Sequence, residues 1–588
     1  MILQALTSLY EALAPKGEVP KEGWSREKIS FALGIDENGD LLRITPLFKP
    51  GDMPKGKKKE EPQEMTVPAA VKRTSGAAAN FLWDNSSYIL GVSLKKGEDD
   101  AEREKQRNKD IKCFEACREL HHSMLDGMEY PAAKAVLNFL DKWEPQKAEE
   151  NNLVAQYAKE ILSGANMVFR FNGGYVHDDP QLASVWQKAN AKQKDNIGQC
   201  LVTGALDEIQ NTHPTIKGVQ GAQSSGAALV SFNASAFCSY NKEQNQNAPV
   251  GKYAAFAYTT ALNHLLADRK NVHRIGDAAV VCWAENADKQ YEDFAAEVFF
   301  GDNVDKSDEQ RLSALRTSLK LLADGLPCKE MDLDPDRKFY ILGLSPNAAR
   351  IAVRFFYCDS FGKIAGNIYR HHERLEIVRP SYDKFPILPL WKLLSATVNP
   401  NAKDKTPNAA MAGAVARAVF SGGRYPASLL ECTFLRIKAE RNITRERAAI
   451  IKAYYLRNPN EKCPKEVLTV SLNENSKNIP YTLGRLFSVY EEIQQAANPG
   501  INTTIKDRYF GSAATMPATV FPILSNLAQK HLRKLSDAQR VYLDKKVMTL
   551  KSVLGEQYPA HMSLPEQGSF DLGYYHQTQA RYTKKEDK

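Results

Sequence analysis

The residues best suited to chemistry lie between Lys217 and Leu266, where amide and hydroxyl side chains alternate with Gly, Val, Phe and Ala. Glycines at positions 218, 221 and 226 allow the backbone to turn sharply or to approach a partner closely. The neutral donors and acceptors are Gln220, Gln223, Ser224, Ser225, Ser231, Asn233, Gln244, Asn245, Gln246 and Asn247. None of them is an evident nucleophile, general base or metal ligand, so the stretch favours reading hydrogen-bond patterns over making or breaking bonds.

Two other groups of residues have types that occur in metal sites. Cys113, Cys117 and His121 share a helix face, but a zinc site takes four ligands and no matching Cys/His pair recurs. His177 and Asp178 resemble the metal-binding dyad of phosphohydrolases, yet no further cluster completes a two-metal set. We interpret both groups as structural and expect no metal and no cofactor. Motifs of serine hydrolases, nucleotide-binding enzymes and zinc proteases are also missing from the sequence, which makes an enzyme the minority hypothesis.

Composition limits the class of protein. At 588 residues the chain exceeds the size at which one hydrophobic core keeps growing, so two or more domains are expected. The net charge of +8 permits a polyanionic partner without requiring one. Nine scattered cysteines, mostly in apolar surroundings, indicate free thiols and a cytoplasmic location. No run of about 18 apolar residues occurs, so we expect no membrane span.

The polar stretch of residues 217–266, called the focal stretch below, must be positioned by other elements of the chain. The first of these are an amphipathic helix predicted over residues 1–14 and a hairpin that turns at Asn38-Gly39. Residues 50–72 are rich in Pro and Lys and predict an exposed loop with a basic tip. A basic turn over residues 72–76 then precedes a predicted strand pair around Asp84-Asn85. A hairpin with exposed cations is one interpretation of this turn, and a phosphate-contacting turn is the other.

Further along, residues 100–199 have a helical pattern, and apolar runs predict strands near residues 274–285, 339–345 and 350–358. Arg350 and Arg354 fall on one face of the last strand. That face could be a nucleic-acid platform or the solvated face of an edge strand, and we favour the solvated face. Beyond a Pro-rich connector at residues 380–407, nearly every segment has the period and length of a helix. We predict an α+β domain with a mixed sheet and helices over residues 1–398, followed by an all-α helical bundle over residues 399–588.

The basic surplus belongs to the helical part. Residues 401–470 carry thirteen basic side chains against six acidic ones. Such a face binds phosphate backbones without reading sequence, whereas Asn, Gln and Ser in the mixed domain are suited to base edges. Lys/Arg-rich helix surfaces and loop-capping amides are the alternative interpretation.

Several blocks resemble one known family. They are MILQALTSLYEALA, RTSGAAANFLWDNSSYILG, QSSGAALVSFNASAFCSYNKEQNQNAPVGKYAAFAYTTALN, LSPNAARIAVRFF, YTLGRLFSVYEEIQ, DRYFGSAATMPATVFP and QGSFDLGYYHQTQ. In this order, over nearly the whole chain, they are similar to the large subunit of the type I-C CRISPR effector complex, Cascade. The resemblance implies a non-enzymatic, RNA-guided DNA surveillance subunit that recognises the protospacer-adjacent motif in duplex DNA. It also implies that the subunit aids duplex opening and R-loop formation, binds the displaced strand, and helps recruit a helicase-nuclease in trans.

The implied partners are double-stranded target DNA and a guide-RNA complex with backbone, guide-end-binding and small subunits, with no membrane partner. Within the mixed domain, which also docks to that complex, the predicted motif-reading residues are Lys72, Arg73, Asn80, Asn85, Gln220, Gln223, Ser224 and Asn233. The predicted contacts to DNA backbone and displaced strand are Lys57, Lys58, Lys59, Arg436, Lys438, Arg445, Lys452, Lys530, Arg533 and Lys534. We interpret Tyr253–Leu266 as the helix that holds the reading loop.

In this family the small subunit resembles the C-terminal part of the large one and is made from an internal start. Residues 470–588 are the corresponding piece here. No Met occurs between Met411 and Met516, so a non-Met start codon at Val467 or Val470 is required. Two other hypotheses stay open at this point: a protein-interaction scaffold, and a cryptic metal-dependent nuclease built on His177, Asp178 or the Cys113 cluster.

Overall fold

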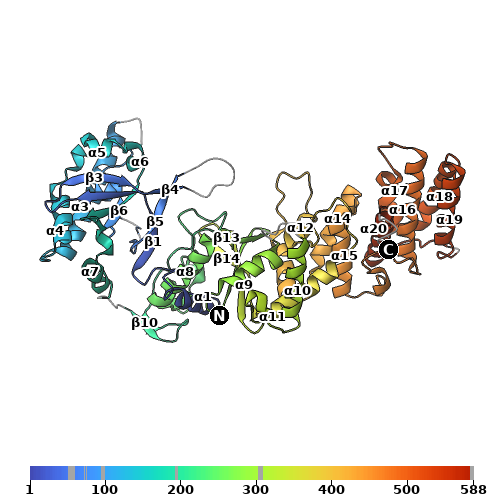
Figure 1. The fold of residues 1–588 in the computed structure, drawn as a ribbon, viewed down its shortest axis with the longest axis horizontal. Coiled ribbons are helices and arrows are strands. Elements are labelled where there is room, and N and C mark those ends of the chain that lie inside the picture. Colours follow the sequence, from blue (N-terminus) through green and yellow to red (C-terminus); the bar gives the residue numbers. More distant parts are fainter. Residues whose placement is uncertain are drawn as a thin grey trace. The chain divides into compact units, whose positions relative to one another are not determined.

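The computed structural model describes residues 1–50, 60–71, 73, 76–94, 100–191, 196–301, 309–555 and 557–582 (Figure 1). The chain forms two compact units, one of residues 3–214 with 232–261 and the other of residues 215–231 with 262–588. Helix α8 (Lys252–Ala267) passes from the first unit to the second.

Two sheets lie at the centre of the first unit. One has the order β1-β5-β4, from β1 (Trp24–Ile29), β5 (Glu60–Pro68) and β4 (Phe48–Pro50). The other has the order β3-β2-β7-β6, from β3 (Leu41–Pro46), β2 (Phe31–Ile35), β7 (Asn166–Phe171) and β6 (Trp83–Asn85), with β8 (Gly174–Tyr175) also paired to β7. Strands β2 and β7 run parallel, so this sheet is mixed. The hairpin predicted around Asn38-Gly39 is confirmed as β2 and β3.

Alternation along β2 divides its side chains between two cores. Phe31 and Leu33 enter a core shared with Phe114 and Phe139 of the covering helices. Ala32 enters a smaller core against the other sheet. The helices of this unit are α1 (Ile2–Leu13), α2 (Ser86–Ile89), α3 (Asp100–Leu125), α4 (Pro131–Lys142), α5 (Asn152–Ala155), α6 (Ala158–Leu162) and α7 (Pro180–Ala191), and β9 (Ile197–Gln199) pairs with β10 (Leu206–Glu208).

The second unit begins with an antiparallel sheet in chain order, β11 (His273–Ile275), β12 (Ala278–Ala284), β13 (Lys338–Asn347) and β14 (Arg350–Ser360). This confirms the strands predicted from the apolar runs. Helices α9 (Lys289–Ala295), α10 (Glu309–Ala323), α11 (Phe361–Leu375) and α12 (Leu390–Ser395) accompany the sheet. One hydrophobic core runs from the sheet, through residues such as Cys282 and Phe339, into the helices beyond.

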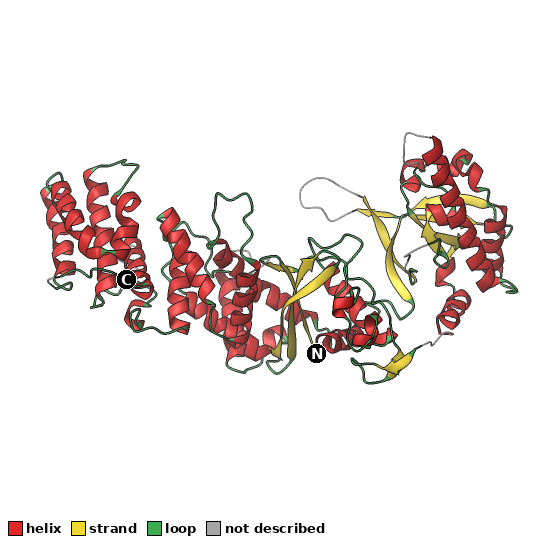
Figure 2. Ribbon diagram, turned by 180° about the vertical axis from the view of Figure 1, so that it is seen from behind, coloured by secondary structure: helices red, strands yellow, loops and turns green. Residues whose placement is uncertain are grey.

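From residue 399 onward the described chain is helical and contains no strand (Figure 2). The helices are α13 (Ala409–Ser421), α14 (Ala427–Glu440), α15 (Arg445–Arg457), α16 (Ile479–Ala497), α17 (Ile505–Thr515), α18 (Pro517–Leu532), α19 (Asp537–Lys551) and α20 (Leu564–Ala580). Side-chain caps fix several starts, including capping boxes at Thr504 and Ser563. The predicted succession of an α+β region and an all-α region is confirmed.

Two predictions in the first unit are wrong. The strand pair expected around Asp84-Asn85 is a short strand, β6, followed by helix α2, because the Asn85 side chain accepts a hydrogen bond from the Ser87 amide and caps the helix. The segment expected to be helical from 100 to 199 is interrupted by β7, a central strand whose residues Met167, Val168 and Phe169 are fully buried. A short buried strand has no period of its own to distinguish it from helix.

Candidate nucleic-acid interface

The predicted reading loop covers residues 220–233, and its part up to Ala228 is fastened to the turn between β13 and β14. The amide of Ala228 donates to the carbonyl of Ala349 over 3.0 Å, and the Ile351 amide donates back to Ala228 over 3.0 Å. The Gln223 amide also donates to the carbonyl of Ala348 over 3.3 Å. Backbone hydrogen bonds thus support the loop, and its exposed side chains can make contacts outside the protein.

Glycine is required at two points in this loop. Gly226 has φ +104°, and a Cβ there would lie 2.6 Å from Oγ1 of Thr215. Gly221 has φ +86°, and a Cβ there would lie 3.2 Å from Pro346 of β13. Both positions combine a left-handed backbone with a close neighbour. Gly221 brings the loop onto the hairpin, and Gly226 brings it onto the preceding segment at Thr215.

The loop presents polar side chains to solvent. Gln220, Gln223 and Ser224 are exposed. Oε1 of Gln220 accepts a hydrogen bond from Nη1 of Arg274 over 2.9 Å, and because a guanidinium can only donate, this contact fixes the orientation of the amide. The Gln220 amide nitrogen is therefore available as a donor, beside a cation. Donor, acceptor and positive charge together are what contacts to a DNA edge and its phosphates require.

Helix α8, which the sequence predicted over residues 253–266, holds the segment that leads into the loop. Oδ1 of Asn263 accepts from the Lys217 amide over 2.8 Å, and its Nδ2 donates to the Thr215 carbonyl over 3.1 Å. A Cβ on Gly218 would lie 3.2 Å from Leu266. Asn233, in contrast, is exposed in the first unit, whereas Gln220, Gln223 and Ser224 belong to the second.

The side-chain amides of Asn245 and Asn247, later in the focal stretch, form hydrogen bonds with the backbone of nearby loops. Asn245 is buried, and its Nδ2 donates to the carbonyl of Gln210 over 2.6 Å. Asn247 accepts from the Ser239 amide and donates to the carbonyls of residues 242 and 244. This segment instead presents Tyr240, which is 95% exposed and has φ +54°. Sequence reasoning missed Tyr240, because an aromatic residue in an apolar-rich stretch gives no signal that it faces solvent.

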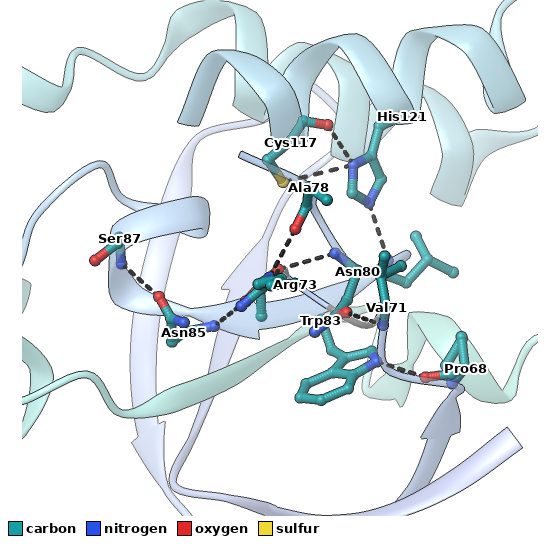
Figure 3. Close-up of polar contacts among 12 residues, drawn as sticks. Pro68, Val71, Arg73, Ala78, Asn80, Trp83, Asn85, Ser87, Cys117 and His121 are labelled. Carbon is teal, nitrogen blue, oxygen red and sulfur yellow. Dashed lines mark hydrogen bonds and ion pairs between the residues drawn. The ribbon is translucent and has the colours of Figure 1, made fainter. Parts of the chain in front are cut away.

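Arg73, the described residue at the centre of the predicted turn, joins a polar network with residues 78–84 (Figure 3). Arg73 forms an ion pair with Asp84, donates from Nε to the Ala78 carbonyl over 2.7 Å, and lies 3.9 Å from the centroid of the Tyr88 ring. Asp84 is 1% exposed, and burial raises the pKa of its carboxyl while the Arg73 charge opposes that shift. The Arg73 guanidinium is thus already committed to Asp84, which leaves it little charge to offer to a phosphate.

Asn80 and Asn85 take part in the same network. Oδ1 of Asn80 accepts from the Val71 backbone amide over 2.9 Å. The backbone amide of Asn80 donates to the Asp84 carboxylate over 2.9 Å (Figure 3). Asn85 caps α2. Both amides support the turn, and Asn80 is also buried, so neither is placed to read bases directly. Lys72 lies outside the described residues, as do Lys57, Lys58 and Lys59.

His121 lies next to this network, and both of its ring nitrogens have a partner. Nδ1 lies 2.7 Å from the Cys117 carbonyl, and Nε2 accepts from the Leu82 amide over 2.9 Å (Figure 3). The first contact requires a proton on Nδ1, which leaves the Nε2 lone pair committed to the backbone. Burial lowers the pKa of His121 to about 4 and raises that of the Cys117 thiol. This geometry belongs to a structural histidine.

The second metal-type pair is arranged differently. His177 is buried, and its Nε2 lies 3.6 Å from Oδ1 of Asp178, beyond hydrogen-bonding distance. Asp178 itself is exposed. Within the described residues, no three His, Cys, Asp or Glu side chains are grouped so that they could hold a metal ion.

The predicted backbone-contacting cations divide into two groups. Arg445 is buried and donates to Asp383 over 2.9 Å, and Lys452 is buried and donates to the Arg374 carbonyl over 3.0 Å. Burial lowers the pKa of Lys452 to about 8. Arg436 is half-buried and lies 3.8 Å from Glu440. The exposed cations are Lys438 on α14 and Lys530, Arg533 and Lys534 at the end of α18. Sequence pattern alone did not separate cations that fasten the bundle from cations that face solvent.

The two arginines on β14 also differ from the predicted solvated face. Arg354 is half-buried and donates from Nη2 to Asp277 over 3.0 Å and from Nε to the Ser345 hydroxyl over 2.9 Å. It therefore anchors the sheet next to the predicted reading loop. Arg350 forms an isolated parallel β-bridge with Ala228. It is partly exposed at the turn to which the loop is fastened.

A family model described as CRISPR-associated protein (Cas_Csd1) matches residues 6–582. No curated protein matches the chain. Over the part of the chain that the structure describes, no helix combines the length and apolar character needed to cross a membrane.

Proposed function

The chain belongs to the CRISPR-associated protein (Cas_Csd1) family, and we propose that it is the non-catalytic large subunit of a type I-C Cascade complex. In this role it recognises the protospacer-adjacent motif in duplex DNA while guide pairing supplies the remaining specificity. It aids duplex opening and R-loop formation, holds the displaced strand and helps recruit a helicase-nuclease. Its partners are the target DNA and the backbone, guide-end-binding and small subunits around the guide RNA.

One observation carries the proposal for motif reading: residues 217–228 form a glycine-shaped loop, fastened to a hairpin turn, that presents Gln220, Gln223 and Ser224 beside Arg274. A reader of a short motif needs few donors and acceptors held in fixed positions, and it needs no nucleophile. Asn233 stays a candidate in the first unit. The roles of Arg73, Asn80 and Asn85 become supportive, since their polar groups hold the turn before β6.

A second part of the proposal concerns the displaced strand. Among the described cations that were predicted for it, Lys438, Lys530, Arg533 and Lys534 are exposed and remain available for phosphates. We assign motif recognition and docking to the guide-RNA complex to residues 1–398, and strand holding to residues 399–588.

Reconstituted Cascade tests the proposal. The complex is incubated with duplexes that share a protospacer but carry a randomised flanking motif, and the bound fraction is sequenced. Wild-type complex should enrich a short motif. Gln223→Ala should relax selectivity at one base position by about 1–3 kcal/mol. Gln181→Ala, which removes an exposed glutamine from α7, is the matched control and should leave the motif unchanged.

Uniform binding to every flanking sequence by the wild-type complex would refute motif reading. Equal loss of affinity for all motifs with Gln223→Ala would instead place the loop on the DNA backbone and would refute its reading role.

A further inference from the structure

A row of side chains crosses the mixed sheet of the first unit on the face opposite the helices. Strand register places Arg43 of β3, Gly34 of β2 and Arg170 of β7 side by side. These positions share a face with Ala32 and Val168, which pack under the second sheet. The second sheet covers the apolar part of that face, whereas the row of Arg43, Gly34 and Arg170 lines a cavity.

Gly34 allows the two arginines to approach each other. A Cβ at position 34 would lie 3.0 Å from Cγ and 3.4 Å from Nε of Arg43, so the Arg43 side chain extends over the glycine toward Arg170. Neighbouring strands lie about 4.8 Å apart, which places the two arginine backbones roughly 10 Å from each other across β2. Two guanidinium groups at this spacing can hold the same small anionic group.

The cavity has a volume of about 590 Å³ and lies between two hairpin turns. Asn38 lies in the turn between β2 and β3, and Asn172 in the turn between β7 and β8; both line the cavity. Asp36 also lines it, and its Oδ1 already accepts from the amides of Asn38 and Asp40, over 3.0 Å and 2.8 Å.

Neither arginine is neutralised within the described part of the chain. Arg43 is exposed and forms no ion pair there. Arg170 donates from Nε to the Gly173 carbonyl over 2.9 Å, and its guanidinium lies 5.5 Å from the Tyr175 ring centroid. Both contacts orient the Arg170 side chain without removing its charge.

We propose that this cavity binds the phosphodiester backbone of a single nucleic-acid strand, with Arg43 and Arg170 on a phosphate and the Asn38 and Asn172 amides on the adjoining nucleotide. A carboxylate ligand would satisfy the arginines alone. A nucleotide also supplies hydroxyl and amino donors, which suit the acceptors of Asn38, Asn172 and Glu37. The choice of nucleic acid among anions rests on the proposed function, but the cavity is distinct from the loop that reads the motif.

Binding of the full-length chain to fluorescein-labelled single-stranded RNA and to DNA of the same sequence tests this site, measured by anisotropy over a series of salt concentrations. Arg43→Gln with Arg170→Gln should weaken binding to the contacted strand by roughly tenfold and lower the slope of log K against log salt by about 0.7, as expected when one phosphate contact is lost. The matched control, Arg107→Gln with Lys112→Gln, removes the same charge from exposed positions of α3 and should leave affinity and slope close to those of the wild type.

Gly34→Val fills the space between the arginines without changing charge, and a β-branched residue suits a strand. It should weaken the same complex, while circular dichroism reports an intact fold. Loss for RNA alone assigns the site to the guide, loss for DNA alone assigns it to the target, and loss for both assigns it to the shared backbone. Unchanged affinity for both strands, or a loss equal to that of the α3 control, would overturn the site. The motif selection described above is measured separately and does not depend on this result.

Discussion

His121 shows how much a single buried residue contributes to the first unit. Its Nε2 accepts from the Leu82 amide and its Nδ1 contacts the Cys117 carbonyl, so the neutral ring joins α3 to the segment before β6. The histidine was noted in the sequence for its spacing from two cysteines, but spacing does not show which ring nitrogen the backbone occupies.

A pH dependence follows from that burial. The folded pKa of His121 is about 4, below the ordinary value of 6.5. As pH falls below 6.5, the unfolded chain takes up a proton that the folded chain refuses, so stability is lost on acidification. Between about pH 7 and about pH 5, the α3 region should lose about 2 kcal/mol more in wild type than in His121→Gln. Hydrogen exchange of α3, followed by mass spectrometry, measures this difference; equal losses in the two proteins would contradict it.

Tyr240 differs from His121 because its side chain faces solvent. Because its ring is 95% exposed, Tyr240→Ala should change the free energy of unfolding by less than about 0.5 kcal/mol. If the ring stacks on an unpaired base, the substitution should weaken binding of single-stranded DNA by about 1–3 kcal/mol, and Tyr240→Phe should restore it. Tyr382→Ala, at an 82% exposed tyrosine of the second unit, is the control. No difference from that control would exclude stacking at Tyr240.

At the scale of elements, helix α16 packs against α20 with almost no space between their backbones. A Cβ on Gly484 would lie 1.9 Å from the Phe570 carbonyl oxygen, and one on Gly573 would lie 2.1 Å from that of Tyr481. Gly484→Ala should therefore destabilise the second unit by about 3 kcal/mol or more, since two rigid backbones must separate. Gly511→Ala in α17 meets no atom within 4 Å and should be neutral or stabilising by up to about 1 kcal/mol. Urea unfolding of both variants measures the contrast, and similar midpoints would refute the close-packing explanation.

The end of α18 carries a prediction about charge. Lys530 and Arg533 are exposed there, so Lys530→Ala with Arg533→Ala should lower affinity for the displaced strand uniformly across sequences. The salt slope should fall by about 1.4, as expected for two lost contacts to a single strand. Lys403→Ala with Lys405→Ala removes two exposed cations from the loop before α13 and is the control. A sequence-dependent loss would show that α18 reads bases.

The elements also show what sequence could and could not predict. Helices α13 to α16, the β2–β3 hairpin and the strands β12 to β14 follow from apolar period and turn residues. Strand β6 and helix α2 are too short to show a period in the sequence, and the Asn85 cap marks the boundary between them. Likewise Arg445 and Lys530 look alike in sequence, because burial of a cation depends on partners distant along the chain, such as Asp383. Glycines and amides singled out the proposed reading loop in the sequence, but the Arg43–Gly34–Arg170 row depends on register between three strands and has no local signal.

At the scale of the whole molecule, the helices after residue 470 depend on the rest of the second unit as well as on each other. Helix α20 packs on α16, but Gly568 on α20 also lies against Tyr455 and Ile451 of α15, where a Cβ would meet those side chains at 3.0 and 3.2 Å. The Tyr575 hydroxyl donates to the Val378 carbonyl over 2.7 Å. A polypeptide of residues 470–588 alone would expose this face of α20.

Residues 470–588 are also proposed to be made separately, from an internal start. Val467 is buried at the end of a short turn, whereas Val470 is 43% exposed in the loop before α16. A product that starts at Val470 therefore begins at an exposed position and lacks the buried Val467. Expression of the gene should yield a second, shorter polypeptide that copurifies with the complex and whose N-terminus maps to this loop. Synonymous changes of the codons for Val467 and Val470 should abolish it and leave the full-length chain intact. If N-terminal mapping finds the short species unchanged after those codon changes, it does not arise from a start at either codon.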